Sequence, residues 1–123
     1  MLTAMPNRYF IVLLALLAAV AYPGSAGAAT TADCQTQIEA LRTDTAAVTT
    51  FANAKDQTGQ LNKLDNAAAA LTAGKTAGAV LKLTDFQAKL QALRSTGKLG
   101  AEDAARLDAG AAAAKSCLES VAT

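Results

Sequence analysis

The sequence predicts an all-α protein: an up-down four-helix bundle that is closed by one disulfide and preceded by a signal peptide. Three observations lead to this fold class. Four segments place apolar residues at helical spacing. No segment shows the alternation or the density of β-branched residues that is typical of a strand. The chain also has two cysteines, one near each end of the helical region.

The start of the chain is typical of a secretory signal peptide. Arg8 supplies positive charge, and residues 10–21 form an unbroken apolar run. This run is shorter than the roughly 20 residues that a membrane-spanning helix needs. Small residues follow, and cleavage after Ala28 or Ala29 fits the preference of the processing site for small side chains. The alternative is an uncleaved membrane anchor.

We therefore expect a signal peptide at residues 1–29 and a helical bundle domain at residues 30–123. A length of this size suits one domain with a small core. The expected location is the periplasm or the secretion medium, with no stable membrane insertion after cleavage. The high alanine content hints at a bacterial source with a GC-rich genome.

The first helix is predicted from Ala32 to Ala52. Thr31 is the expected N-cap, and Asp33 is favourable in the first turn. Residues 53–56 are the expected connection to the next helix. The core-facing positions of the first helix recur at steps of four and three, which places them on one face. They are Cys34, Ile38, Leu41, Thr45, Val48 and Ala52.

The second helix is predicted from Gln57 to Ala73, and Gly74 is the glycine expected just past its end. Its expected core face consists of Leu61, Leu64, Ala68 and Leu71.

The third helix is predicted from Thr76 to Ser95, with Thr76 as a possible cap and Gly97 closing it. Its expected core face consists of Ala79, Leu83, Phe86, Leu90 and Leu93.

The fourth helix is predicted from Ala101 to Val121. Glu102 and Asp103 lie at its N-terminal end, where carboxylates are favoured. Gly110 inside this helix costs about 1 kcal/mol relative to alanine. Its expected core face consists of Ala104, Leu107, Ala111, Ala114, Leu118 and Val121.

Cys34 and Cys117 are predicted to form one disulfide, as two cysteines in an exported chain usually do. Short connections favour antiparallel neighbours, so an even number of helices returns the chain to its starting point. The alternatives are two buried free thiols, or lipidation of Cys34. Asp33 argues against lipidation, because a lipoprotein signal places a small uncharged residue before its cysteine.

Alanine is the dominant residue of the expected domain, with 24 copies among residues 30–123. Alanine favours helix formation but buries little apolar surface. On the chain-entropy model a bridge over so long a loop contributes about 4 to 5 kcal/mol. We therefore expect the disulfide to be necessary for stability.

Composition and charge exclude several functions. The chain has 11 basic and 10 acidic residues, so loss of Arg8 with the leader leaves ten of each. A nucleic-acid binder or a membrane-surface helix would show a basic excess. There is no histidine or tryptophan, and both methionines and both tyrosines lie in the leader. Imidazole-dependent catalysis and zinc, copper or haem ligation therefore lack their usual residues.

We expect no enzyme activity, no cofactor and no metal. Serine–lysine chemistry is a remaining route, but Lys115 and Ser116 point about 100° apart on a helix. A paired-carboxylate site at Asp65 and Asp85 has nothing in the sequence that places them together.

Two features of the third helix are candidate partner surfaces. Lys75, Lys82 and Lys89 recur every seven residues and form a stripe beside the core face. The stripe would suit an anionic polymer, or it is a solvated edge whose methylenes cover the core. Leu81 faces mostly outward, where a partner or a second copy would cover it. A single exposed leucine is also ordinary.

The segment from Gly59 to Ala114 resembles the FIMAH domain, a small helical module of bacterial extracellular proteins. The resemblance rests on the spacing of leucine and alanine in the second and third helices and on two Gly-Lys turns. The matching positions are Leu61 to Leu71, Gly74-Lys75, Leu83, Phe86, Leu93, Gly97-Lys98-Leu99, Ala105 and Leu107. Gly100 departs from the pattern, where a capping serine or threonine is expected. The resemblance implies an accessory, non-catalytic role and assigns no functional residues.

These observations lead to one leading expectation. The protein is expected to be a secreted, non-catalytic interaction or accessory module that binds an extracellular protein or polymer. The alternative is a carrier that holds a small apolar ligand between its helices.

Overall fold

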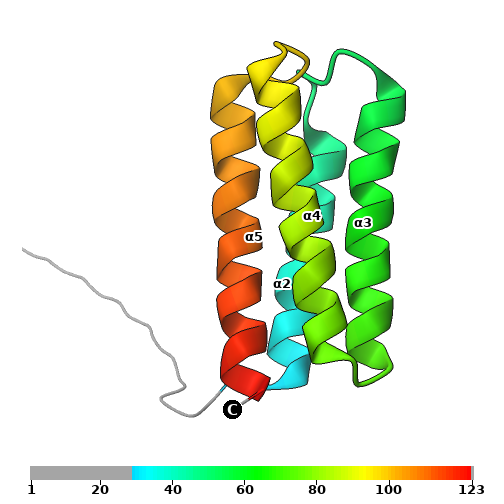
Figure 1. Cartoon of the computed structure of the whole chain (residues 1–123), viewed down its shortest axis with the longest axis vertical. Coiled ribbons are helices and arrows are strands. Elements are labelled where there is room, and N and C mark those ends of the chain that lie inside the picture. The colour runs from blue at the N-terminus through cyan, green and yellow to red at the C-terminus, as the bar shows by residue number, and fades with distance from the viewer. Residues whose placement is uncertain (1–28, 123) are drawn as a thin grey trace, which may run out of the picture.

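The structure, a computed structural model, describes residues 29–122. This part of the chain forms four helices and no strand: α2 (Thr31–Ala47), α3 (Ala54–Thr72), α4 (Thr76–Ser95) and α5 (Ala101–Ala122). The helices run side by side in alternating directions, so the predicted up-down four-helix bundle is confirmed (Figure 1). The predicted signal peptide lies outside the described residues except for Ala29, which packs against the core.

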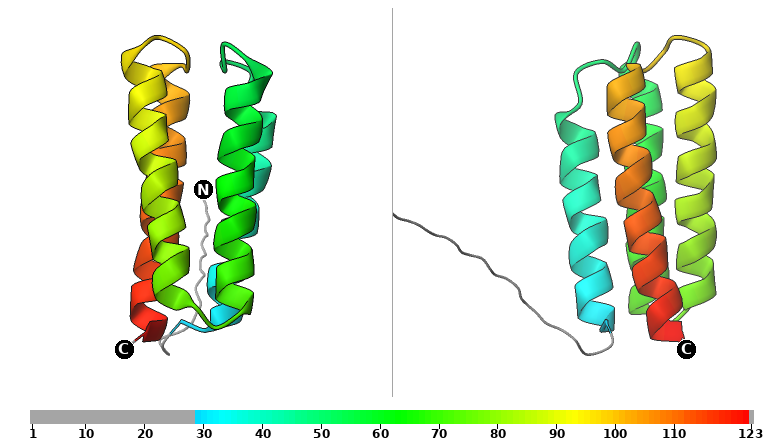
Figure 2. Two further views of the ribbon diagram at one scale, coloured as in Figure 1. Left: turned by 45° about the vertical axis from the view of Figure 1, so that its right-hand side comes forward. Right: turned by 90° about the vertical axis from the view of Figure 1, so that its left-hand side faces the viewer.

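Each helix packs against two neighbours. Helix α2 contacts α3 and α5, and α4 contacts the same two helices from the other side. The two views in Figure 2 show that α2 begins and α5 ends at the same pole of the bundle. The even number of helices therefore brings the ends of the described chain together.

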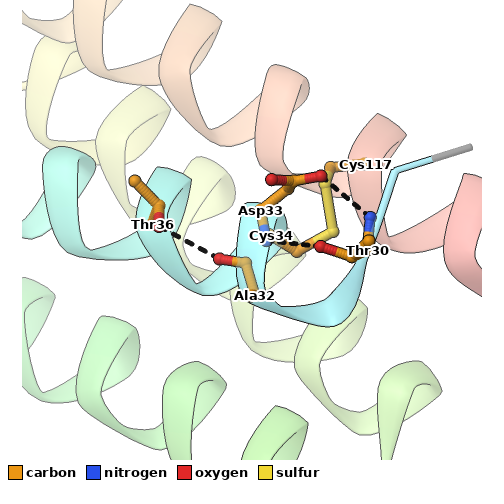
Figure 3. Close-up of a disulfide and its surroundings, with 6 residues drawn as sticks. All are labelled: Thr30, Ala32, Asp33, Cys34, Thr36 and Cys117. Atoms are coloured by element: carbon orange, nitrogen blue, oxygen red, sulfur yellow. Dashed lines mark hydrogen bonds between the residues drawn. A yellow bond between two sulfur atoms is a disulfide. The ribbon is translucent and has the colours of Figure 1, made fainter. Parts of the chain in front are cut away.

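The predicted disulfide is confirmed. Cys34 of α2 is bonded to Cys117 of α5, and their Cα atoms lie 5.6 Å apart across a sequence separation of 83 (Figure 3). Both cysteines are buried. The free-thiol and lipidation alternatives are therefore wrong. A disulfide is typical of proteins that fold in an oxidising compartment outside the cytoplasm.

Helix α2 begins with a capping box. Thr30 is the N-cap rather than the predicted Thr31, and its hydroxyl accepts a 3.1 Å hydrogen bond from the backbone N–H of Asp33. The Asp33 carboxylate in turn accepts a 3.0 Å bond from the backbone N–H of Thr30 (Figure 3). The reciprocal pair requires an acid three residues after the cap, which Thr30 has and Thr31 lacks.

Helix α2 ends at Ala47, five residues before the predicted end at Ala52. A run of β-branched residues begins at Val48, and such residues lose side-chain freedom in a helix. The Gln57 side chain caps this end of the helix, because its amide donates hydrogen bonds to the carbonyls of Thr45, Ala46 and Val48. Val48 is still buried, as expected. Ala52 is exposed, so its predicted place in the core is wrong.

Helix α3 begins three residues earlier than predicted. Asn53 is its N-cap, accepting a 2.8 Å bond from the backbone N–H of Asp56, so residues 54–56 are helical rather than connecting. The buried face is rotated from the predicted one. Gln60 and Ala67 are fully buried, while Leu61 and Ala68 are only partly buried. The observed face lies between α2 and α4, the two helices that α3 contacts.

Helix α4 spans the predicted residues, and its five predicted core positions are all buried. Its N-cap is Lys75, which makes no side-chain capping bond, so the predicted cap at Thr76 is wrong. The turns on either side contain Gly74 and Gly97 with φ of 79° and 72°. Glycine suits this left-handed conformation because it has no Cβ to clash.

Helix α5 buries the predicted face from Ala104 to Leu118, and Val121 is partly buried against the core. The alanines of the core are fully buried, which lets the helices approach closely and limits the apolar area each contributes. These alanines are Ala67, Ala79, Ala104, Ala111 and Ala114. The disulfide is therefore expected to contribute a large share of the stability.

Candidate functional site

Leu81 is the most exposed large apolar side chain in the described part of the chain, at 64% exposure. The core positions of α4 determine that the Leu81 side chain points outward. Because Leu83, Phe86 and Leu90 face inward, a residue at position 81 lies on the far side of a helix with about 3.6 residues per turn. An exposed leucine forgoes the free energy of burial that its core neighbours gain.

An open apolar groove lies beside Leu81. We call it the Leu81 groove, and its volume is about 470 Å³. It runs between the start of α4 and the end of α5, and it is lined by Thr76, Ala77, Val80, Leu81, Leu118 and Glu119. The small side chain of Ala77 leaves this space unfilled. Leu118 lies next to Cys117, so the disulfide holds the α5 wall of the groove in place.

The lysine stripe lies on the other side of α4. Lys89 reaches Asp56 of α3, with 3.8 Å between Nζ and Oδ1. Lys75 is exposed in the turn before α4, and Lys82 is exposed one residue after Leu81. Position 82 is turned about 100° from Leu81 toward α3. The four predicted partner-surface residues therefore divide between the α3 side and the α5 side of α4.

A second groove, which the sequence reasoning missed, lies between α2 and α5. Its volume is about 250 Å³, and its lining includes the polar side chains of Gln37 and Asp44. Gly110 forms part of its floor, and a Cβ atom at this position would lie 2.9 Å from Cδ1 of Leu41. The glycine in α5 is therefore explained by the close packing of Leu41. Its mixed lining makes this groove less suited to an apolar partner than the Leu81 groove.

The candidate catalytic residues are engaged elsewhere. Lys115 donates a 2.9 Å bond to Gln87 of α4, away from the adjacent Ser116. Asp65 forms an ion pair with Arg42 of α2, at 2.6 Å, rather than a pair with Asp85. This interaction raises the pKa of the Arg42 guanidinium through the hydrogen bond and the carboxylate charge. The described residues contain no group of three histidine, cysteine or acidic side chains that could hold a metal ion.

A polar cluster at the opposite pole was also missed. The Thr50 hydroxyl accepts a 3.1 Å bond from the backbone N–H of Gly100 and donates a 2.6 Å bond to Asp103. Arg106 adds a 2.8 Å ion pair to the same carboxylate. The bond from Thr50, followed by the one from Arg106, lowers the pKa of Asp103 below 3.8. The cluster joins the α2–α3 connection to the start of α5, and we assign it a structural role.

The fold and this surface define a disulfide-closed, alanine-rich four-helix bundle with an apolar groove beside an exposed leucine. No family model, curated protein or solved structure matches the chain. The resemblance to the FIMAH domain therefore stays a prediction made from the residues. None of the helices between residues 29 and 122 is long and apolar enough to cross a membrane.

Proposed function

We propose that this protein is a secreted, non-catalytic interaction module that binds an extracellular protein through the Leu81 groove. One observation carries the proposal: an exposed leucine lies at the edge of an open, almost wholly apolar groove. Apolar surface of this kind on a small protein is typical of a contact surface. The signal-peptide pattern and the disulfide support an extracytoplasmic site of action.

The lysine stripe gives less support to an anionic polymer as the partner. Lys89 is already paired with Asp56, which leaves Lys75 and Lys82 as the charges that could meet a polymer. Exposed lysines separated by seven residues also lie about 10 Å apart along a helix. A protein partner that places one aliphatic side chain in the groove fits the described surface better.

The proposal is tested by substitution at Leu81. Wild-type protein is immobilised beside Leu81→Glu and Ala69→Glu, and each is exposed to proteins of the native envelope and medium. Ala69 is the matched control because it is an exposed helical residue on α3, away from the groove. We expect a partner that is retained by wild type and Ala69→Glu and lost by Leu81→Glu, with unchanged thermal unfolding. Unchanged retention by a Leu81→Glu variant would contradict the proposal.

The groove also favours a second candidate function, carriage of a small apolar ligand. Its volume of about 470 Å³ falls in the range of small-molecule sites, although it is more open than most. Native mass spectrometry of protein from its own secretion medium tests this function. A bound mass that disappears in Leu81→Glu would support carriage, and a clean unliganded mass would argue against it.

A further inference from the structure

The Leu81 side chain and the Leu81 groove lie side by side on one surface and are complementary to each other. Leu81 projects from α4, and the groove lies directly beside it between α4 and α5. A projecting side chain next to a hollow of its own chemistry is self-complementary under a two-fold rotation, because each copy supplies both parts. Rotation about an axis between the two places Leu81 of one copy over the groove of the other, and the reverse.

The charges that flank this surface have the same symmetry. Glu119 lines the α5 edge of the groove, and Lys82 lies beyond Leu81 on the side toward α3. The order across the surface is therefore acid, groove, leucine, base. The same two-fold rotation brings Lys82 of one copy opposite Glu119 of the other, twice. Neither residue takes part in an ion pair within residues 29–122, so both charges are available for these contacts.

We propose that the partner of the Leu81 groove is a second copy of this chain, bound as a two-fold symmetric dimer whose axis runs along the helices, so that the two α4 helices are parallel. Leu81 of each copy fills the groove of the other, and Lys82 pairs with Glu119 across the axis. The inference rests on the proposed function, since it uses the same docking surface. Ala77 lines the groove and allows the two α4 backbones to approach.

The dimer is expected to be weak. The contact covers only the pole of the bundle where α4 starts and α5 ends, and stable interfaces usually bury more than about 1,000 Å² in total. Self-association should therefore depend on concentration. A different extracellular partner would compete with it for the same groove.

The first experiment measures mass against concentration. Analytical ultracentrifugation is performed on exported protein with the Cys34–Cys117 bond intact, from about 1 μM to about 1 mM. We expect the average mass to rise toward that of a dimer. Leu81→Glu should weaken association by about tenfold or more, because it removes the leucine that the dimer would bury and places a charge in the interface. Ala69→Glu should associate as wild type does. A wild-type protein that stays monomeric, or a dimer that survives Leu81→Glu, would overturn the proposal.

The second experiment exchanges the charges. Lys82→Glu and Glu119→Lys should each weaken the dimer by about two- to fivefold or more, because each places like charges together. The double variant Lys82→Glu/Glu119→Lys should recover most of the lost affinity, since the opposite charges face each other again. A double variant weaker than both single variants would overturn the assigned two-fold arrangement. Thermal unfolding by circular dichroism confirms that each variant is folded.

The two proposals fail separately. If wild type is monomeric at all concentrations but loses an envelope partner on Leu81→Glu, the module stands and the dimer is wrong. If the dimer forms through Leu81 but retention of every envelope protein is unaffected, the dimer stands and the proposed extracellular partner is wrong. An apolar ligand bound to a monomer would assign the groove to carriage instead.

Discussion

At the scale of single residues, Thr50 hydrogen-bonds to the start of a helix to which it is not adjacent in the sequence. The start of α5 lacks a capping side chain because residue 100 is glycine. From the α2–α3 connection, the Thr50 hydroxyl links the backbone N–H of Gly100 to the carboxylate of Asp103 in the first turn of α5. A Cβ atom at position 100 would lie 2.9 Å from this hydroxyl, so any side chain placed there would disturb the bridge. The glycine that departs from the expected capping pattern is thus required by a long-range contact.

The first prediction concerns Asp103 and pH. Its pKa is lower in the folded protein than the usual 3.8, so the ionised carboxylate stabilises the fold. This contribution is complete above pH 3.8 and is lost as the pH falls through the folded-state pKa. We expect Asp103→Asn to be less stable than wild type at neutral pH, and the difference to shrink in acid. Urea unfolding from about pH 6 to about pH 2 checks this.

Thr50→Val is the companion variant for that experiment. It removes the hydroxyl that is the largest cause of the lowered pKa of Asp103. The Asp103 pKa, followed by carboxyl NMR signals, should rise toward its usual value. A pKa that does not move would show that Arg106 alone holds the carboxylate ionised.

The second prediction concerns Gln60, which lies in the core with no exposed surface. Its amide nitrogen donates a 3.0 Å bond to the carbonyl of Phe86, but its Oε1 has no partner within the described chain. An unsatisfied buried acceptor costs about 1–3 kcal/mol, and one ordinary hydrogen bond contributes about 1 kcal/mol. Gln60→Met keeps the shape and removes both. We expect the free energy of unfolding to rise by up to about 1 kcal/mol in urea titrations. A clear fall would mean that the amide holds α3 to α4.

At the scale of helices, the glycines separate helix interiors from helix ends. Gly59 lies within α3, and a Cβ atom there would meet nothing within 4 Å. Gly74 follows α3 with a positive φ of 79°. An alanine would therefore fit at position 59 but would be strained at position 74.

The third prediction follows from this contrast. Gly59→Ala should raise the free energy of unfolding by about 0.5–1 kcal/mol, because alanine is the better helix former. Gly74→Ala should lower it by about 1–2 kcal/mol, because an L-residue is strained in the left-handed conformation. Chemical denaturation of both variants measures the pair. Equal effects of the two substitutions would contradict the assigned end of α3.

At the scale of the whole molecule, the disulfide closes the bundle where its two ends meet. Cys34–Cys117 joins the first turn of α2 to the last turns of α5 and lies beside the α5 wall of the Leu81 groove. It therefore restricts the unfolded chain over most of its length. It also holds together the two ends of an alanine-rich bundle that buries little apolar area per residue.

The fourth prediction is that loss of the bridge is the most damaging of these changes. Cys34→Ala/Cys117→Ala should lower the free energy of unfolding by about 2–5 kcal/mol. The alanine pair avoids the buried hydroxyls that serine would add. Urea unfolding of the variant is compared with that of reduced and oxidised wild type. An unchanged midpoint in the variant would show that the helix contacts alone hold the fold.

Several features of the fold were predictable from the sequence. They are the number of helices, the extent of α4, the core faces of α4 and α5, and the pairing of Cys34 with Cys117. The helix number, the extent of α4 and the core faces depend on helical periodicity and on glycines at helix ends, which are properties of near neighbours along the chain. The disulfide pairing follows because the chain has two cysteines and an even number of helices brings them to one pole. The signal peptide remains a prediction from Arg8, the apolar run and the small residues that follow it. The separation of the lysine stripe from Leu81 was predictable from helical spacing, but which helix lies beside each of them was not.

The remaining features depend on contacts between residues far apart in the sequence. Burial of Gln60 follows from the two helices that flank α3, and no local pattern favours a polar residue in the core. The early end of α2 combines a local cause, the β-branched run from Val48, with the bonds that the Gln57 side chain of α3 donates to carbonyls at the end of α2. The Leu81 groove lies between α4 and α5 at one pole, where the small side chain of Ala77 leaves space between the two helices. Such a hollow is a property of packing between helices, which periodicity within one helix cannot reveal.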